Sequence, residues 1–394
     1  MAETVNVKNI GLRGVTVADS KVSFIDGEKG ILIYRGYRIE ELGNSSTFPE
    51  TAFLLLNGVL PNKEEMNEFN GKLLEARNIP DFLLEAIKQF PHNAHPMDVL
   101  QASIPMLATI DPDLNDETRE GNIRKAIRLI ARLPIVVAAW HRIRNDKSPL
   151  PPDLSLSHAG NFLWLLNGEK PSEEMAGDLD TCLLLHADHT FNASTFTCRQ
   201  VVSTKAHMYS GVAAGVGALS GSLHGGANER VMQMLLAVKN EDNIEQWVQD
   251  KIASGEKIMG MGHAVYTTTD PRASFLKETA LRLSTKHDKD NFIKLAIQIE
   301  EAAINEFSKR GKSKIKANVD FYSATVYNMM DIPLDMMTPI FAISRVAGWA
   351  AHIIEEKTGE AQEKPALYRP KAEYIGRYCG LMGCSYEPPK ERED

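Results

Sequence analysis

The 394-residue sequence has few cysteines and no concentrated positive charge. Its four cysteines, Cys182, Cys198, Cys379 and Cys384, are too few and too irregularly spaced for a disulfide framework or a paired CxxC zinc site, and they suggest a reducing compartment. Acidic residues outnumber basic ones by 52 to 44, and Lys and Arg form no stripe with interleaved aromatic residues. A nucleic-acid partner is therefore disfavoured.

Signals for secretion or membrane insertion are also missing. The N-terminal segment MAETVNVKN has neither the basic region nor the apolar stretch of a secretory signal, so the predicted location is cytoplasmic. The most apolar stretch, residues 339–354, is short for a membrane span and contains Arg345 and His352. We interpret it as a buried helix and expect no membrane partner.

Strand patterns are scarce. The best is KVSFIDGEKGILIYRGY, which alternates around Asp26-Gly27 and predicts a hairpin. Elsewhere apolar residues recur at helical spacing, as in Phe292, Leu295 and Ile299. Hydrophobic residues make up 43% and charged residues 24%, which are globular values. We therefore predict an all-α fold with a short N-terminal β-hairpin, long enough for about two domains.

Four short segments concentrate residues suited to catalysis or binding. They are HADH from His186, GSLHGGANE from Gly221, GMGHAVYTTTDPR from Gly260 and NVDFYS from Asn318. Taken alone, a histidine is more often a hydrogen-bonded structural residue than a catalyst. The combination of the four segments is what points to a site.

His224 lies just before Gly225-Gly226 and a helical stretch that we expect to begin near Ala227. Its imidazole is then next to the positive end of a helix dipole, which favours a neutral ring. A neutral imidazole can donate a hydrogen bond to a carbonyl oxygen that is becoming an enolate. The alternative is a histidine that only caps the helix.

His263 and Asp320 each have a functional and a structural interpretation. His263 follows Gly260 and Gly262, whose missing side chains let the main chain approach a ligand such as adenine or pantetheine, or merely form a tight turn. Asp320 precedes an apolar helix expected from about Ser323. It is either a helix cap or a general base whose pKa is adjusted by partial burial.

Two arginines differ in their surroundings. Arg272 follows the turn-forming pair Asp270-Pro271 and is compatible with an ordinary solvated side chain. Arg345 is the only formally charged residue within 336–354. A buried guanidinium needs an anionic partner, which is either a structural carboxylate or a substrate.

The ordered set HADHxxNASTF, GxLHGGANE, GxGHxVYxxxDPR, NVDFYS, SRxxGWxAH and YRP resembles the citrate synthase family, together with YRGY and HPMDV near the N-terminus. The matches run in the family's order over nearly the whole chain. The resemblance implies a multi-helical, two-domain fold. Residues 1–224 and 324–394 would form a large domain, and residues 225–323 a small domain on the coenzyme A side of a cleft that closes over the substrates.

The resemblance also implies a reaction. Acetyl-CoA, oxaloacetate and water would give citrate and coenzyme A through an enol(ate) of acetyl-CoA and a citryl-CoA intermediate, as in the tricarboxylic acid cycle, with no metal or redox cofactor. His224, His263 and Asp320 would be the catalytic residues. Oxaloacetate would be held by His189, Arg272, Arg345 and Arg369. Arg369 would come from the other subunit of a homodimer.

The expected coenzyme A site is less well defined. The resemblance assigns to it Lys257, Ile258, Met259, Gly260, Met261 and Lys314. Many family members carry a basic residue just after GHxVY that can meet a coenzyme phosphate, whereas this chain has threonines at 267–269. Lys257, Lys312 and Lys314 are the cations that can substitute for it.

Three other readings remain. A 2-methylcitrate synthase uses propionyl-CoA with the same catalytic residues, and the segment YNMM at 327–330 resembles that branch too. One methylene changes binding by only about 1–3 kcal/mol, so dual specificity stays open.

A hydrolase with His186 and His189 as a metal pair is disfavoured, because the HExxH glutamate and a clear third ligand are missing. A non-enzymatic dimer that binds coenzyme A is disfavoured because every expected catalytic position is filled.

Overall fold

The computed structural model describes residues 11–12, 14–239, 241–287, 291–362, 366–377 and 380–391. The helices of this part are α1 (Ile39–Ser45), α2 (Phe48–Asn57), α3 (Lys63–Glu75), α4 (Asp81–Ile87), α5 (Pro96–Ala108), α6 (Arg119–Arg144), α7 (His158–Asn167), α8 (Glu173–His186), α9 (Ala193–Val202), α10 (Met208–Ser220), α11 (Ala227–Val238), α12 (Ile244–Ala253), α13 (Pro271–His287), α14 (Phe292–Lys309), α15 (Val319–Met329) and α16 (Met337–Thr358), with single 3-10 turns η1 (Leu334–Met336) and η2 (Pro389–Glu391). The predicted all-α class is confirmed.

The predicted hairpin is also present. Strands β1 (Ser23–Asp26) and β2 (Ile31–Tyr34) pair antiparallel, with Asp26 opposite Ile31, so the turn comprises residues 27–30. A two-residue strand β3 (Tyr37–Arg38), which we did not predict, adds to β2. Leu32 and Tyr34 of β2 are completely buried, so the hairpin is anchored to the helical core.

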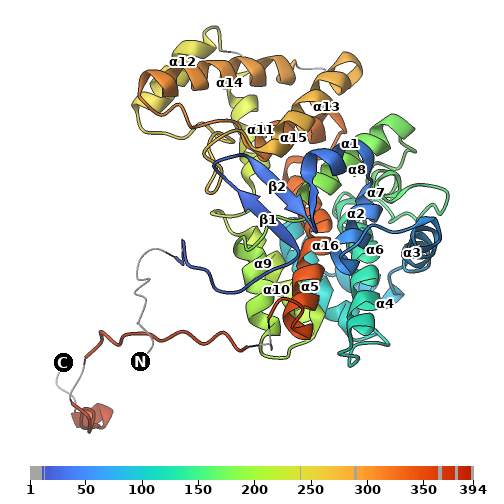
Figure 1. The fold of residues 1–394 in the computed structure, drawn as a ribbon, viewed down its shortest axis with the longest axis vertical. Helices are drawn as coiled ribbons and strands as arrows, with labels where there is room; N and C mark the ends of the chain where they lie inside the picture. The colour runs from blue at the N-terminus through green and yellow to red at the C-terminus, as the bar shows by residue number, and fades with distance from the viewer. Residues whose placement is uncertain are drawn as a thin grey trace.

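Helix α16 runs through the middle of the molecule (Figure 1). It packs against α2, α6, α8, α9 and α10, and its small residues allow close approach. A Cβ atom on Gly348, for example, would lie 2.3 Å from the carbonyl oxygen of Ala187. The segment Leu334–Thr358 is long and apolar enough to cross a membrane by composition, but 94% of its apolar window is buried in the protein. The interpretation of residues 339–354 as a buried helix is confirmed.

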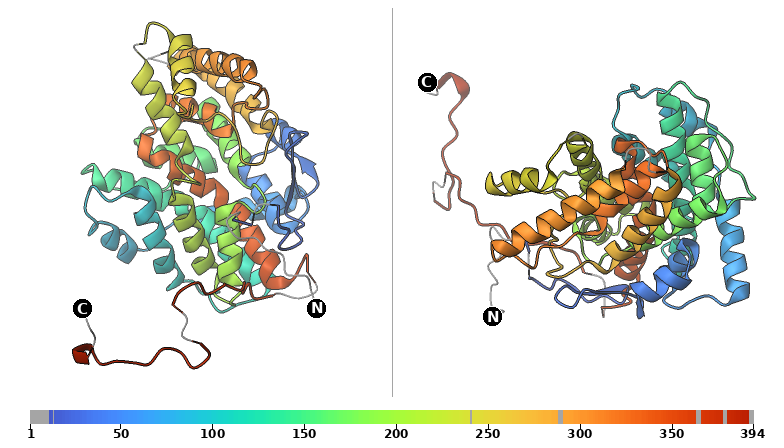
Figure 2. Two further views of the ribbon diagram at one scale, coloured as in Figure 1. Left: turned by 90° about the vertical axis from the view of Figure 1, so that its left-hand side faces the viewer. Right: turned by 90° about the horizontal axis from the view of Figure 1, so that it is seen from above.

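Helices α11 to α15 pack on one another and lie together at one end of the molecule (Figures 1 and 2). They meet the rest through α13, which contacts α1 and α8, and through α11, which contacts α16. The division into a small domain at 225–323 and a large domain from both chain ends stays a prediction.

Two sequence expectations need correction or completion. Helix α15 begins at Val319 rather than near Ser323, because Asn318 and not Asp320 is its N-cap. Cys182 and Cys198 are buried free thiols, as expected in a reducing compartment, but Cys384 is disulfide-bonded. Cys379 lies outside the described residues.

Candidate functional site

A cavity of about 840 Å³ brings together six of the seven residues expected to act in catalysis or to hold oxaloacetate. They come from parts of the chain that are far apart in the sequence: His189 after α8, His224 between α10 and α11, His263 before α13, Arg272 in α13, Asp320 in α15 and Arg345 in α16. The seventh, Arg369, does not line the cavity of its own chain.

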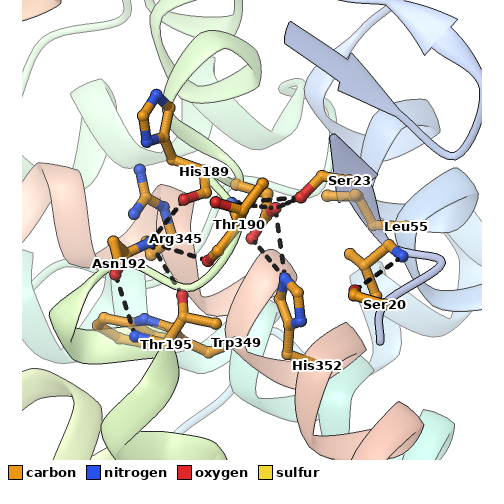
Figure 3. A network of polar contacts seen from close by, with 12 residues as sticks. Ser20, Ser23, Leu55, His189, Thr190, Asn192, Thr195, Arg345, Trp349 and His352 are labelled. Atoms are coloured by element: carbon orange, nitrogen blue, oxygen red, sulfur yellow. Dashed lines mark hydrogen bonds and ion pairs between the residues drawn. The ribbon is translucent and has the colours of Figure 1, made fainter. Parts of the chain in front are cut away.

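A buried polar network holds the turn that carries His189 (Figure 3). The carboxylate of Asp188 accepts hydrogen bonds from Ser23 Oγ and the amide of Thr190, and its Oδ1 lies 3.3 Å from His352 Nε2. Tyr34 Oη donates to the carbonyl oxygen of Asp188 at 2.7 Å. The hairpin and α16 thus fix the backbone on both sides of His189, including the left-handed conformation of Thr190.

Arg345 is a buried cation with no carboxylate at ion-pair distance among the described residues. Its side chain is 1% exposed, its Nε donates to the carbonyl oxygen of His186 at 2.7 Å, and its guanidinium lies over the ring of Phe341. Burial lowers the pKa of Arg345 to about 10. The buried carboxylate of Asp188 offsets part of this shift without forming an ion pair, and the guanidinium also lines the cavity, where it can meet a ligand.

Arg272 is not a solvated arginine, because its side chain is 2% exposed. Its Nε and Nη2 donate to the two carboxylate oxygens of Asp270 at 3.0 and 2.7 Å. Burial would lower the pKa of Arg272, but the ion pair with Asp270 raises it above the ordinary value. The remaining nitrogen, Nη1, has no hydrogen-bond partner in the described chain and stays available for a ligand.

The imidazole of His224 is neutral, and the hydrogen bonds around it fix which ring nitrogen carries the hydrogen. Burial, and next the charge of Arg345, lower the pKa of His224 to about 4. Its Nε2 accepts from the amide of Ser194 at 3.2 Å and lies 2.8 Å from Ser194 Oγ, so the ring hydrogen belongs on Nδ1. His224 does not cap α11, whose N-cap is Gly226 in the left-handed conformation.

His263 has the opposite tautomer. Its Nδ1 accepts from the amides of Val265 and Tyr266 at 2.9 and 3.2 Å, which leaves the hydrogen on Nε2. Burial, and next the charge of Arg272, lower the pKa of His263 to about 4, so this ring is neutral too. Its centroid lies 5.2 Å from that of His189.

The loop that carries His263 is positioned by contacts on two sides. The amide of Thr267 donates to the carbonyl oxygen of Gly27 in the hairpin turn at 2.9 Å, and a Cβ atom on Gly27 would lie 2.2 Å from the carbonyl oxygen of Val265. On the other side, Asn318 Nδ2 donates to the carbonyl oxygen of Gly262 at 2.8 Å.

Asp320 lies in the first turn of α15 and does not cap it. The cap is Asn318, whose Oδ1 accepts from the amide of Asp320 at 3.0 Å. Burial raises the pKa of Asp320 to about 6, even though the nearby Arg272 and Arg345 act in the opposite direction. The cavity therefore holds one carboxyl group whose pKa is about 6, together with neutral imidazoles and two guanidiniums.

Comparisons with known proteins identify the family. The family model "Citrate synthase, C-terminal domain" matches residues 11–371. The chain belongs to the citrate synthase family. It is therefore an enzyme of the transferase class. The citrate synthase of Synechocystis sp. is 42% identical over 382 residues, which cover 97% of this chain and 93% of that protein.

Solved structures of citrate synthases are similar over nearly the full length. The crystal structure of the enzyme from Pyrobaculum aerophilum has a TM-score of 0.90 at 36% identity, covering 97% of this chain and 95% of that one. The enzyme from Thermoplasma acidophilum has a TM-score of 0.88 at 33% identity, covering 97% and 99%. That structure is described as a ternary complex with carboxymethyl coenzyme A and oxaloacetate.

The segment expected to recognise coenzyme A precedes the loop that carries His263 but does not line the cavity. Lys257, Lys312 and Lys314 are exposed, whereas the side chain of Ile258 is buried in the core and leaves only its main chain for a ligand. Gly260 has a φ of 77°, and an added Cβ would lie 2.8 Å from Phe321, so glycine is required there. The roles of Met259, Met261 and the other members of this set stay predictions.

His186 does not form a metal pair with His189. Its ring is fully buried, with Nδ1 2.7 Å from the carbonyl oxygen of Cys182, and it packs against Phe341. Within the described ranges, no three His, Cys, Asp or Glu side chains are grouped so that they could hold a metal ion.

Several contributors were not singled out from the sequence. Asp270 was read only as part of a turn, although an acid two residues before an arginine at a helix start is a signal for a local ion pair. The roles of Ser194 and of the hairpin turn were not predicted although both lie in quoted motifs, and residues 14–18, which line the cavity, carry no motif of their own. They act through contacts between distant segments.

Proposed function

We propose that this member of the citrate synthase family condenses acetyl-CoA with oxaloacetate and water to give citrate and coenzyme A. The observation that carries the proposal is the arrangement of Asp320, His224 and His263 around one cavity. A carboxyl group with a pKa near neutrality and two neutral hydrogen-bond donors suit proton removal next to a carbonyl group.

We propose that the dicarboxylate oxaloacetate binds in the part of the cavity that Arg272 and Arg345 line. Arg345 and the free Nη1 of Arg272 would bind its carboxylates by charge-assisted hydrogen bonds. His189 is neutral, because burial and then Arg272 lower its pKa, and its Nε2 has no partner in the described chain. Arg369 of the partner subunit would complete the site, so the active form is a homodimer.

The first chemical step is proton transfer. The carboxylate of Asp320 removes a proton from the methyl group of acetyl-CoA, and negative charge moves to the thioester oxygen. His224 donates a hydrogen bond from Nδ1 to that oxygen without losing its proton. Each such positioned group accelerates a reaction by roughly 10²–10⁴-fold. The product is an enol(ate) held next to oxaloacetate.

The second step forms a carbon–carbon bond. The enol carbon attacks the ketone carbon of oxaloacetate, and the ketone oxygen takes the proton from Nε2 of His263, so that citryl-CoA carries a hydroxyl group. The proton that Asp320 took from the methyl group then returns to His263 through water. Water then cleaves the thioester to citrate and coenzyme A. The reaction consists of proton transfers, the formation of one carbon–carbon bond and one hydrolysis, so it balances without a redox cofactor or metal.

Closure of the cleft is part of the proposal. Residues 225–323 would act as a small domain that moves against residues 1–224 and 324–394. Exclusion of water until condensation would protect acetyl-CoA from hydrolysis. Coenzyme A would lie against Lys257–Met261, with exposed lysines such as Lys314 near its phosphates. The cytoplasm is the proposed location.

The alternative acyl donor is propionyl-CoA, as in 2-methylcitrate synthases. The test compares kcat/KM for acetyl-CoA and propionyl-CoA with saturating oxaloacetate, with citrate and 2-methylcitrate identified by mass spectrometry. We expect a preference for acetyl-CoA of at least about tenfold, the scale of one methylene. A preference for propionyl-CoA would make 2-methylcitrate synthesis the function, and no thiol release with either donor would contradict both.

A further inference from the structure

A second cavity of about 660 Å³ lies away from the proposed active site and shares none of its lining residues. Its walls come from α3, from the segment before α7, and from the first turns of α2, α7 and α8. The N-caps of those three helices, Thr47, Ser157 and Ser172, all line it. Three positive helix ends therefore face one space, which the acidic residues Glu173 and Asp180 also line.

Arg77 adds a full charge to this cavity and has no counter-ion. The residue is 7% exposed, and its Nη1 donates to the carbonyl oxygen of Leu156 at 2.9 Å. No carboxylate pairs with Arg77 in the described part of the chain, and burial is the only cause that lowers its pKa. A buried cation without a partner is costly, so the molecule carries a charge here that its own fold does not use.

The N-terminus of α7, next to this guanidinium, has main-chain amides without acceptors among the described residues. Ser157 Oγ accepts from the amide of Gly160, but the amides of His158 and Ala159 have no acceptor among the described residues. The carbonyl that holds Arg77 belongs to the residue just before this cap. By contrast, the end of α2 is already filled, because Asp180 accepts from the amide of Phe48 at 2.7 Å.

His158 supplies a second unpartnered polar group. Its side chain is 5% exposed and lines the cavity, and neither ring nitrogen has a hydrogen-bond partner. Burial, and next the charge of Arg77, lower the pKa of His158 to about 3, so the ring is neutral, and both of its nitrogens are themselves buried. Asp180 does not neutralise Arg77, since neither residue is a cause of the other's pKa shift.

We propose that this cavity binds a small organic anion, with its carboxylate or phosphate group held by Arg77 and the first turn of α7. The rest of the ligand is apolar, because apolar side chains from α3 and from the segment before α7 also line the cavity. They are Met66, Leu73, Leu74, Leu154 and Leu156. The site is independent of the proposed catalytic function.

Calorimetric titration of the whole protein with octanoate tests the assignment, with inorganic phosphate as the purely ionic probe. Arg77→Met keeps the apolar bulk and removes the charge, and should weaken octanoate binding at least about tenfold, the effect of one lost charge-assisted hydrogen bond. Arg132→Met is the matched control. Arg132 is also partly buried, has a pKa lowered by burial and lines neither cavity.

A second pair of variants guards against misfolding of Arg77→Met. Leu154 is 63% exposed and lines the cavity, so Leu154→Asp should fold and repel the anion, whereas Val59→Asp changes a residue that is 60% exposed and lines neither cavity. Selective loss of octanoate binding in Arg77→Met and Leu154→Asp supports the site. No binding to the wild type, or equal binding by all variants, overturns it. Phosphate binding as tight as that of octanoate overturns the apolar part.

Discussion

The side-chain amide of Asn318 donates to the carbonyl oxygen of Gly262 at 2.8 Å. The same side chain caps α15 through its Oδ1, and its main-chain amide donates to Gly260. One residue therefore joins the loop that ends at His263 to the helix turn that carries Asp320. These two groups would have to act on two different substrates within one closed site.

Asn318→Asp should separate the two roles of this residue. An aspartate still caps α15, but it cannot donate to Gly262, so we expect kcat to fall by about 10–100-fold with less than about 1 kcal/mol of lost stability. Steady-state kinetics and thermal unfolding measure both. Asn62→Asp, at the capped start of α3, is the control and should leave kcat unchanged. An unaltered kcat in Asn318→Asp would refute the coupling.

The hairpin turn should matter for catalysis although it contains no catalytic group. Gly27→Ala would push a methyl group against the carbonyl oxygen of Val265, whose amide donates to His263. We expect kcat to fall about tenfold or more, because the imidazole shifts relative to its target. Gly71→Ala in α3, where an added Cβ meets nothing within 4 Å, is the matched control. Equal kcat in the two variants would show that the turn does not position the loop.

Removal of the carboxylate next to Arg272 should affect both affinity and stability. Asp270→Asn leaves a buried guanidinium without its partner, which costs roughly 3–5 kcal/mol, and frees it to change orientation. We expect the KM for oxaloacetate to rise at least about tenfold. Asp335→Asn breaks the ion pair with Arg144 and is the control, since Asp335 does not line the cavity. An unchanged KM together with lower stability would make Asp270 purely structural.

The pH dependence of the reaction should report Asp320. Burial raises the pKa of this carboxyl from 3.8 to about 6, and the base is active only when deprotonated. Activity should therefore be constant above about pH 7 and fall towards tenfold per unit as the pH drops below the pKa. The histidines do not interfere, because the pKa values of His224 and His263 are near 4 and both rings stay neutral. The profile of kcat/KM for acetyl-CoA from pH 5 to 8 checks this, and a flat profile would exclude the raised pKa.

Local pattern was enough to predict the fold class and the hairpin, whereas the six cavity residues were named by the resemblance to the citrate synthase family. Local pattern drew attention to His224 and Asp320 near helix starts and to Arg345 as a lone charge on an apolar helix, but it left a structural alternative open for each. The contact between Gly27 and Val265 was beyond prediction, since it joins segments that no periodicity relates. The bond from Ser194 to His224, which sets the tautomer, was hidden for the same reason.

Replacement of Asp320 by asparagine tests the central claim most directly. The amide keeps the shape of the side chain but cannot accept the methyl proton, and removal of a buried carboxyl with a raised pKa should not lower Tm. The account predicts that thiol release from acetyl-CoA and oxaloacetate falls at least about 10³-fold, while calorimetry still detects oxaloacetate binding. A folded Asp320→Asn variant that releases thiol within about tenfold of the wild-type rate would contradict the account.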